Sequence, residues 1–191
     1  RVRVAMRRLP EPAPVWRRNG KAGMRYYIDT EFNGTGGQLL SMALVREDGA
    51  SFYEVLHAHE LIVPWVREHV VPHFGREPVD RMQAVKKLQK FLRKDTGPHV
   101  FIADWPEDLA HFNTMLLRDH GRRNDPLQFS CLLLHLPGFD TATASEVPHN
   151  ALADARALAD YVEGNLSGTR AGMVPEDLAL VRNACGLRPL A

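Results

Sequence analysis

The sequence predicts an α/β fold, in which an antiparallel three-strand meander is followed by parallel strands within one mixed sheet flanked by helices. Three observations favour it. Residues 26–32, 39–45 and 51–56 are short apolar runs rich in strand-forming residues, with turn-forming segments between them. The Asp-Gly pair at 48–49 is a strong cue for a tight hairpin. Beyond residue 56, helical periodicity alternates with short apolar runs, which predicts further strands separated by helices.

The remaining elements follow from periodicity and from breaks at Gly and Pro. In chain order they are helices over 60–71 and 78–94, a strand over 99–103, a helix from 105 through 116, a strand or helix over 127–134, a polar loop over 138–147, a helix over 148–162, a Gly-rich linker over 164–174 and a helix over 175–184. Periodicity does not decide between strand and helix for residues 127–134, because the run is short and wholly apolar.

The composition is that of an ordinary globular domain. The chain has 191 residues, of which 45% are hydrophobic and 25% charged, enough for one domain with a full core. No apolar run approaches the ~20 residues that span a bilayer, and no signal-peptide pattern opens the chain. Its two cysteines, Cys131 and Cys185, lack metal-ligand spacing. We therefore expect a cytoplasmic protein that does not associate with membranes.

Charge is distributed unevenly along the chain. The formal net charge is +1, but residues 1–23 hold seven Lys or Arg and one acid, which leaves residues 24–191 at −5. The first 23 residues also contain the Pro-rich run Leu9–Pro14, which resists regular structure. We expect 1–23 to be a leader outside the fold and 24–191 to be a single domain. A basic arm that grips phosphates is the alternative for the leader.

Two acids close the first predicted strand. Asp29 and Glu31 are two positions apart, so their side chains point to the same face of a strand. Adjacent carboxylates raise each other's pKa unless a cation lies between them, and oxygen ligands of this kind suit Mg²⁺ or Mn²⁺. Taken alone, a D-x-E pattern is also common at solvated strand ends.

Further acids and a histidine stand at comparable positions. Asp104 ends the strand at 99–103, where it could be a metal ligand or merely the N-cap of the next helix. His149 precedes Asp154 by five residues at the start of the Ala-rich helix, so both can face one site. The sequence thus has D-x-E on a first strand, Asp at a later strand end, and His-x4-Asp opening a late helix.

This ordered set resembles the DEDDh branch of the DEDD superfamily of 3′–5′ exonucleases, which has a ribonuclease H-like fold. The resemblance covers about residues 24–163, with motif spacings of about 75 and 45 residues. The runs Asp29-Thr30-Glu31-Phe32, Asp104-Trp105 and 149–156 are most similar to the small exoribonucleases related to the polyadenylate-specific 3′-exoribonuclease and ribonuclease T.

The resemblance implies a two-metal mechanism that hydrolyses single-stranded RNA from its 3′ end to nucleoside 5′-monophosphates. Four carboxylates would hold two Mg²⁺ ions, with Mn²⁺ as a substitute: Asp29, Glu31, Asp104 and Asp154. His149 would be the general base, because an imidazole titrates near neutral pH. Backbone amides around Thr30 would contact the terminal nucleotide, Phe32 would stack on its base, and Trp105 would also contact substrate.

Two basic clusters lie outside these motifs. Arg118, Arg122 and Arg123 are candidates for phosphate contacts, and in a homodimer of the kind found among such relatives they would serve the partner's active site. The basic face of the helix at 78–94 could meet a nucleic-acid backbone, although a solvated face is the favoured interpretation.

Two other functions remain open at the level of sequence. A proofreading or repair 3′–5′ exonuclease acting on DNA would use the same residues, because discrimination depends on contacts to the 2′-OH. A non-catalytic nucleic-acid-binding module is less favoured, since all four acids and His149 are present.

Overall fold

The computed structural model describes residues 23–95, 97–117 and 129–187. Within them the chain forms a five-stranded mixed sheet in the order β3-β2-β1-β4-β5. The strands are β1 (Met24–Phe32), β2 (Leu39–Arg46), β3 (Ser51–Val55), β4 (His99–Ala103) and β5 (Phe129–Leu133). β1 pairs antiparallel with β2 and parallel with β4, and β5 continues the parallel half. The predicted meander and mixed sheet are confirmed.

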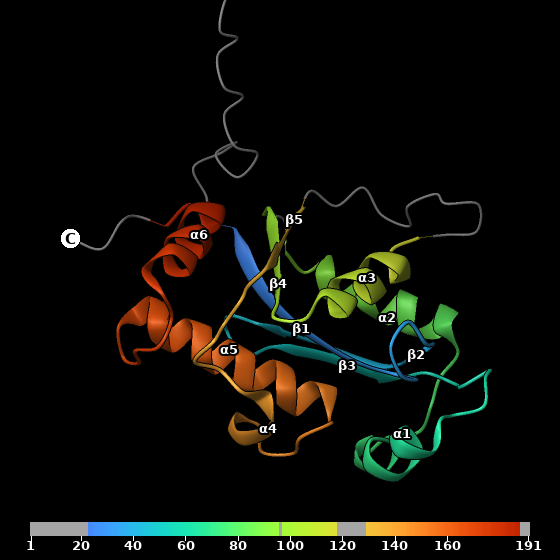
Figure 1. The fold of residues 1–191 in the computed structure, drawn as a ribbon. Coiled ribbons are helices and arrows are strands. Elements are labelled where there is room, and N and C mark those ends of the chain that lie inside the picture. The colour runs from blue at the N-terminus through green and yellow to red at the C-terminus, as the bar shows by residue number, and fades with distance from the viewer. Residues whose placement is uncertain (1–22, 96, 118–128, 188–191) are drawn as a thin grey trace, which may run out of the picture.

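Helices cover both faces of the sheet (Figure 1). They are α1 (Pro64–His69), α2 (Arg81–Leu92), α3 (Pro106–Met115), α4 (Thr141–Ala144), α5 (Ala151–Ser167) and α6 (Pro175–Cys185), with the 3-10 turn η2 (Val71–His73) after α1. α2 and α3 pack on one face and α5 on the other. None of the described helices is long and apolar enough to span a membrane.

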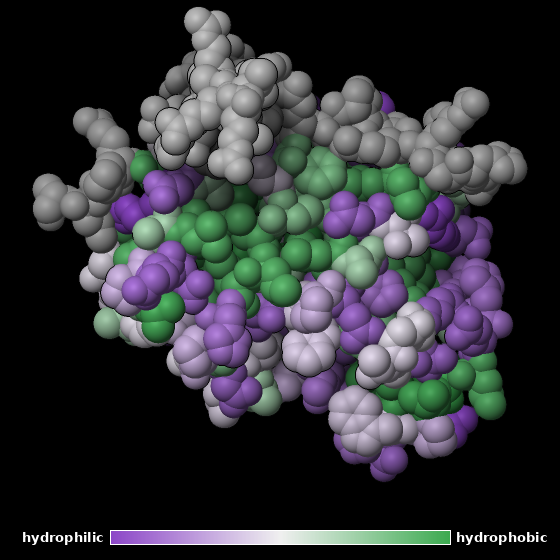
Figure 2. All heavy atoms as spheres, turned by 45° about the horizontal axis from the view of Figure 1, so that its top comes forward, coloured by the Kyte–Doolittle hydropathy of each residue, from purple (hydrophilic) through white to green (hydrophobic). Residues whose placement is uncertain are grey.

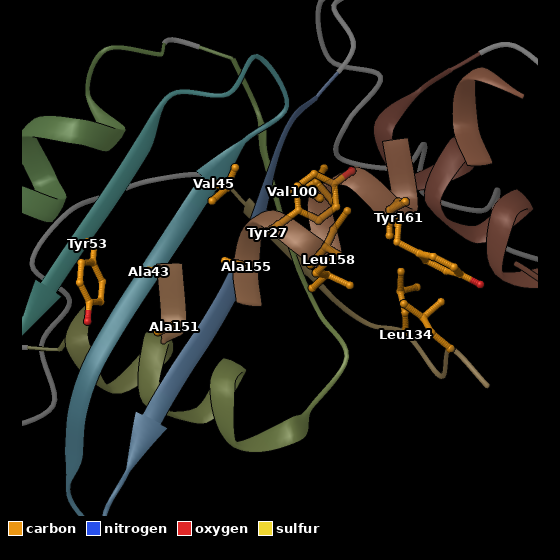
Figure 3. Close-up of a cluster of buried hydrophobic side chains, with 14 of the residues drawn as sticks. Tyr27, Ala43, Val45, Tyr53, Val100, Leu134, Ala151, Ala155, Leu158 and Tyr161 are labelled. Atoms are coloured by element: carbon orange, nitrogen blue, oxygen red, sulfur yellow. The ribbon is translucent and has the colours of Figure 1, made fainter. Parts of the chain in front are cut away.

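Alternation along β1 divides the core into two clusters. Tyr27 faces the α5 side, whereas Tyr26 and Ile28 face the α2 and α3 side. On the α5 side, Ala151 and Ala155 lie near the sheet and Leu158 fills the space beyond them (Figure 3). These small side chains let the first turns of α5 approach β1 and β2 closely. The N-terminal end of α5 is thereby held beside the end of β1.

The structure corrects two of the predicted helices. The segment at 60–71 is helical only from Pro64 to His69, because Asn33 binds the backbone of Leu61 and Val63 in an extended segment ahead of it. The helix predicted over 78–94 begins at Arg81, because Val79 instead pairs with Leu56 beside β3. In both places, tertiary hydrogen bonds override local periodicity.

Several other predicted element boundaries differ from the observed ones. The undecided run at 127–134 contains β5, and the predicted loop at 138–147 contains α4, which Asp140 caps. α5 extends to Ser167, where Gly168 ends it at φ 76°, so the predicted linker is shorter than expected. Gly23, assigned to the leader, is buried and its N–H donates to Cys185 O, whereas residues 1–22 lie outside the described part of the chain.

β5 is an edge strand, and its outer side meets solvent. Leu133 is 48% exposed. Figure 2, which brings the top of Figure 1 forward, shows hydrophobic residues gathered on this side of the molecule between hydrophilic ones.

Candidate active site

Three carboxylates converge where β1 ends beside the first turn of α5. Ligand oxygens of Asp29, Glu31 and Asp154 all lie within 4.8 Å of one another. The first two share the face of β1 that also carries Tyr27, and the third comes from α5 packed on that face. The prediction that the D-x-E pair stands side by side is confirmed, and α5 adds a third acid to it.

Burial and mutual repulsion hold protons on this cluster. Burial, followed by the charges of Asp154 and Asp108, raises the pKa of Glu31 to about 8. Burial also raises the pKa of Asp154 to about 6, although the Ser145 hydroxyl and the His149 N–H partly oppose it. The pKa of Asp29 is raised well above its ordinary value by burial and then by Asp108, Glu31 and other acids. A divalent cation would remove this repulsion.

One oxygen of the cluster has no partner among the described residues. Asp154 is 5% exposed, and its Oδ1 is buried without a hydrogen bond in the described part of the chain. Its other oxygen, Oδ2, accepts the backbone N–H of His149 at 3.1 Å. A buried carboxylate oxygen is costly to leave unpaired. The donor set consists of oxygens alone, so the site fits a hard cation such as Mg²⁺ or Mn²⁺.

His149 lies directly before α5 in a left-handed backbone conformation, with φ 66°. Asn150 caps the helix by accepting the N–H of Ala153 at 3.1 Å, and its amide donates to His73 O. Burial, followed by the nearby His73 and His69, lowers the pKa of His149. The imidazole therefore favours its neutral form, which can accept a proton.

An aromatic neighbour contacts this histidine. Trp65 meets the His149 ring edge to face, with centroids 5.3 Å apart, and stacks on His69 at 4.8 Å. Its side chain is nevertheless 53% exposed. In the helix predicted over 60–71, the spacing of Trp65 is that of a core residue, so sequence analysis did not single it out.

Asp108 was missed by sequence analysis. It is 2% exposed, and its Oδ1 accepts both the N–H and the hydroxyl of Thr30, at 3.0 and 2.6 Å. Burial is the main cause that raises its pKa to about 7, and its charge is the largest electrostatic influence on Asp29. An acid in the first turn of a helix is expected there for the helix dipole alone, which concealed its place in the site.

Asp104 lies farther out. It does not cap α3, whose N-cap is Trp105 with no capping side chain, so the alternative of a simple N-cap is wrong. Burial raises the pKa of Asp104, and its charge reaches Asp29, Asp108 and Asp154. It contributes to the same acidic field, but among the acids that act on Asp29 its influence is the smallest named.

The residues predicted to contact substrate differ in their burial and in their hydrogen-bond partners. Thr30 is buried and its N–H is engaged by Asp108, which occupies the amide assigned to the terminal nucleotide. Phe32 is half-buried and lies 5.3 Å from the His111 ring. Trp105 is 56% exposed and its indole N–H donates to Glu107. Arg118, Arg122 and Arg123 lie outside the described residues.

Hydrogen bonds between residues far apart in the sequence hold the segments around the site. Glu107 of α3 accepts the N–H of Gly36 at 2.6 Å, which ties the turn after β1 to the start of α3. Asn33 binds the segment that leads into α1. Trp65 and Trp105, which are both exposed, therefore lie on segments that are anchored to the turn after Phe32. No protein-family model matches this chain, and no curated protein matches it at a significant level.

Proposed function

We propose that this chain is a metal-dependent 3′–5′ exoribonuclease of the DEDDh type with a ribonuclease H-like fold. The observation that carries the proposal is the convergence of ligand oxygens of Asp29, Glu31 and Asp154 within 4.8 Å of one another. Within the described part of the chain, Asp154 Oδ1 is buried without a hydrogen bond, and the N–H of His149 donates to the other oxygen of the same carboxyl group. The strand order, with an antiparallel meander before the parallel half, supports the fold assignment.

Asp29, Glu31 and Asp154 would hold divalent cations, with Mg²⁺ as the expected ion and Mn²⁺ as a substitute. When bound, such ions polarise a phosphodiester and stabilise charge on the attacking and leaving oxygens. We assign Asp108 to this carboxylate set ahead of Asp104, because it is bonded directly to the residue between Asp29 and Glu31 and its charge also acts on Asp29. Thr30 orients it through two hydrogen bonds to one oxygen, which leaves Oδ2 outside that pair.

His149 would accept a proton from the attacking water. Its neutral form is favoured by burial and by the neighbouring histidines, as a general base requires. The N–H bond to Asp154 fixes its backbone, and Trp65 limits the positions of its ring. Proton acceptance is thus separated from cation binding, because the backbone of His149, not its ring, contacts the carboxylate.

Trp105 and Phe32 would contact the bases of the terminal nucleotides. Trp105 offers an exposed π-face, and every base can stack on such a face whatever its identity. The preference for RNA over DNA is proposed from the sequence resemblance. The free thiols Cys131 and Cys185 suit a reducing cytoplasm.

The test uses the full chain with matched 5′-labelled single-stranded RNA and DNA, each with and without a 3′ oligo(A) segment. Reactions contain Mg²⁺, Mn²⁺ or EDTA, and Asp29→Asn is the control. The expected result is a ladder that shortens from the 3′ end of RNA, requires the metal, and is absent in the variant. A ladder on DNA alone would identify the DNA exonuclease instead, and no ladder on any substrate would favour the binding module.

A further inference from the structure

A run of basic residues follows the exposed side of α2 and the two positions after it. Residues 86–94 contain five Lys or Arg and no acid, whereas the rest of the chain from residue 24 onward is net acidic. We call these five residues the α2 basic surface: Lys86, Lys87, Lys90, Arg93 and Lys94. All five are exposed, while Leu88, Phe91 and Leu92 between them are buried in the core.

Two hollows adjoin along this surface. The first has a volume of about 360 Å³ and is lined by Gln89 together with every member of the α2 basic surface except Lys87. The second, of about 260 Å³, shares Lys90 and Lys94 with it and adds Lys87 and Arg76. The surface is therefore concave as well as cationic, so a ligand lying in it would meet several charges at once.

The charges of this surface are unequally satisfied. Lys87 and Arg76 both pair with Glu54, at 2.9 and 3.3 Å, so the acid at the rim of the hollow already has two cations. Lys86, Lys90 and Lys94 make no ion pair within the described residues. They recur every four residues, and like charges at that spacing along a helix repel one another. Such a row gains stability from a bound polyanion.

The second hollow extends from α2 to the first turn of α5. It crosses the outer edge of β3 at residues 51–54 and reaches Leu152. Leu152 belongs to the first turn of α5, between His149 and Asp154. The hollow therefore reaches the helix turn that also carries Asp154, although Leu152 and Asp154 lie on different flanks of α5.

We propose that the α2 basic surface binds the sugar-phosphate backbone of the substrate strand on the 5′ side of the scissile bond. This inference rests on the proposed function and extends it from the 3′ end to the body of the strand. Phosphodiesters stay ionised at every physiological pH, and lysines bind them as point charges without reading sequence. Nucleotides upstream of the 3′ end would therefore add affinity in proportion to their phosphates and not to their bases.

The experiment compares substrate lengths in the double variant Lys90→Glu/Lys94→Glu, which alters the two cations shared by both hollows. KM for a 20-nucleotide RNA should rise at least about tenfold, while turnover of a dinucleotide should be unchanged. The dependence of log(kcat/KM) on log[salt] should flatten by about 1.4, that is ~0.7 for each of two lost phosphate contacts on a single strand. Equal effects on both substrates, or an unchanged salt slope, would overturn the proposal.

Arg156→Glu/Arg170→Glu is the matched control, because it makes the same charge change on α5 and the loop after it, across the sheet from α2. It should leave the length dependence intact. A second arm measures binding of the 20-nucleotide RNA in EDTA by fluorescence anisotropy, with polyglutamate as competitor. If the native chain cleaves nothing but binds RNA through Lys90 and Lys94, the catalytic proposal fails and this one stands. If polyglutamate competes as well as RNA, the surface is a general anion site and this proposal fails.

Discussion

Asp108 accepts two hydrogen bonds from Thr30 through a single oxygen, at 3.0 Å from the backbone nitrogen and 2.6 Å from the hydroxyl. These hydrogen bonds join the first turn of α3 to the end of β1, at Thr30, which lies between the two acids of the D-x-E pattern. Thr30 therefore positions an acid that joins the cluster from the opposite face of the sheet. Thr30 lies between the proposed ligands Asp29 and Glu31, and it acts on the site by holding a third acid, Asp108.

This relationship predicts a contrast between two neighbouring acids. Asp108→Asn keeps an oxygen for Thr30 but removes the charge beside Asp29, so activity on single-stranded RNA should fall at least about 100-fold. Asp104→Asn should lose less than about tenfold, because Asp104 acts more weakly on the cluster. Steady-state rates of both folded variants test this, with circular dichroism as the check on folding. A greater loss for Asp104→Asn would restore the assignment made from sequence.

The raised pKa values predict an unusual pH dependence of stability for the metal-free protein. Folded-state values of about 8 for Glu31, 7 for Asp108 and 6 for Asp154 exceed the ordinary carboxyl value of ~4. The folded state thus retains protons that the unfolded chain has released. The free energy of unfolding should fall as pH rises from about 4 through 8, by up to about 1.4 kcal/mol per pH unit for each proton retained.

Mg²⁺ should reverse this trend, because it stabilises the ionised cluster. Urea unfolding at pH 5.5 and 8.0 in EDTA and in Mg²⁺ measures both effects, and the gain from Mg²⁺ should be larger at pH 8.0. Glu31→Gln supplies the control: it should flatten the pH slope in EDTA and reduce the gain from Mg²⁺. Parallel pH profiles with and without the metal would contradict a cation site at this cluster.

Much of the fold and part of this site follow from the sequence by elementary geometry. The two-residue period of β1 is enough to place Asp29 and Glu31 on one face, and the helical period brings Asp154 to the start of α5 on that side. Asp108 was not predictable in this way, because an acid after Pro106 is expected in any helix N-terminus. The exposure of Trp65 was not predictable for a similar reason: Asn33 binds Val63, thirty positions further along the chain, and so holds the segment that carries Trp65.

His149 offers a test that separates proton transfer from metal binding. His149→Asn should lower kcat by about 10²–10⁴, the contribution usual for a general base. Asn tolerates the left-handed φ of 66° and keeps the N–H that donates to Asp154. Calorimetric affinity for Mn²⁺ should therefore change little. His135→Asn, at an exposed loop position, is the matched control and should retain full kcat.

Trp65 and Trp105 should affect different kinetic constants. Trp65→Ala removes the ring that contacts His149, so kcat should fall about tenfold or more as the imidazole loses its position, with KM nearly constant. Trp105→Ala removes an exposed stacking face beside Glu107, so KM should rise about tenfold, within the 1–3 kcal/mol typical of base stacking. Trp65→Phe should restore most of kcat, because an aromatic edge contact remains possible. Initial rates over a range of RNA concentrations give both constants. If both alanine variants changed KM alone, Trp65 would belong to substrate binding, and the link from Trp65 to the proton-accepting histidine would be wrong.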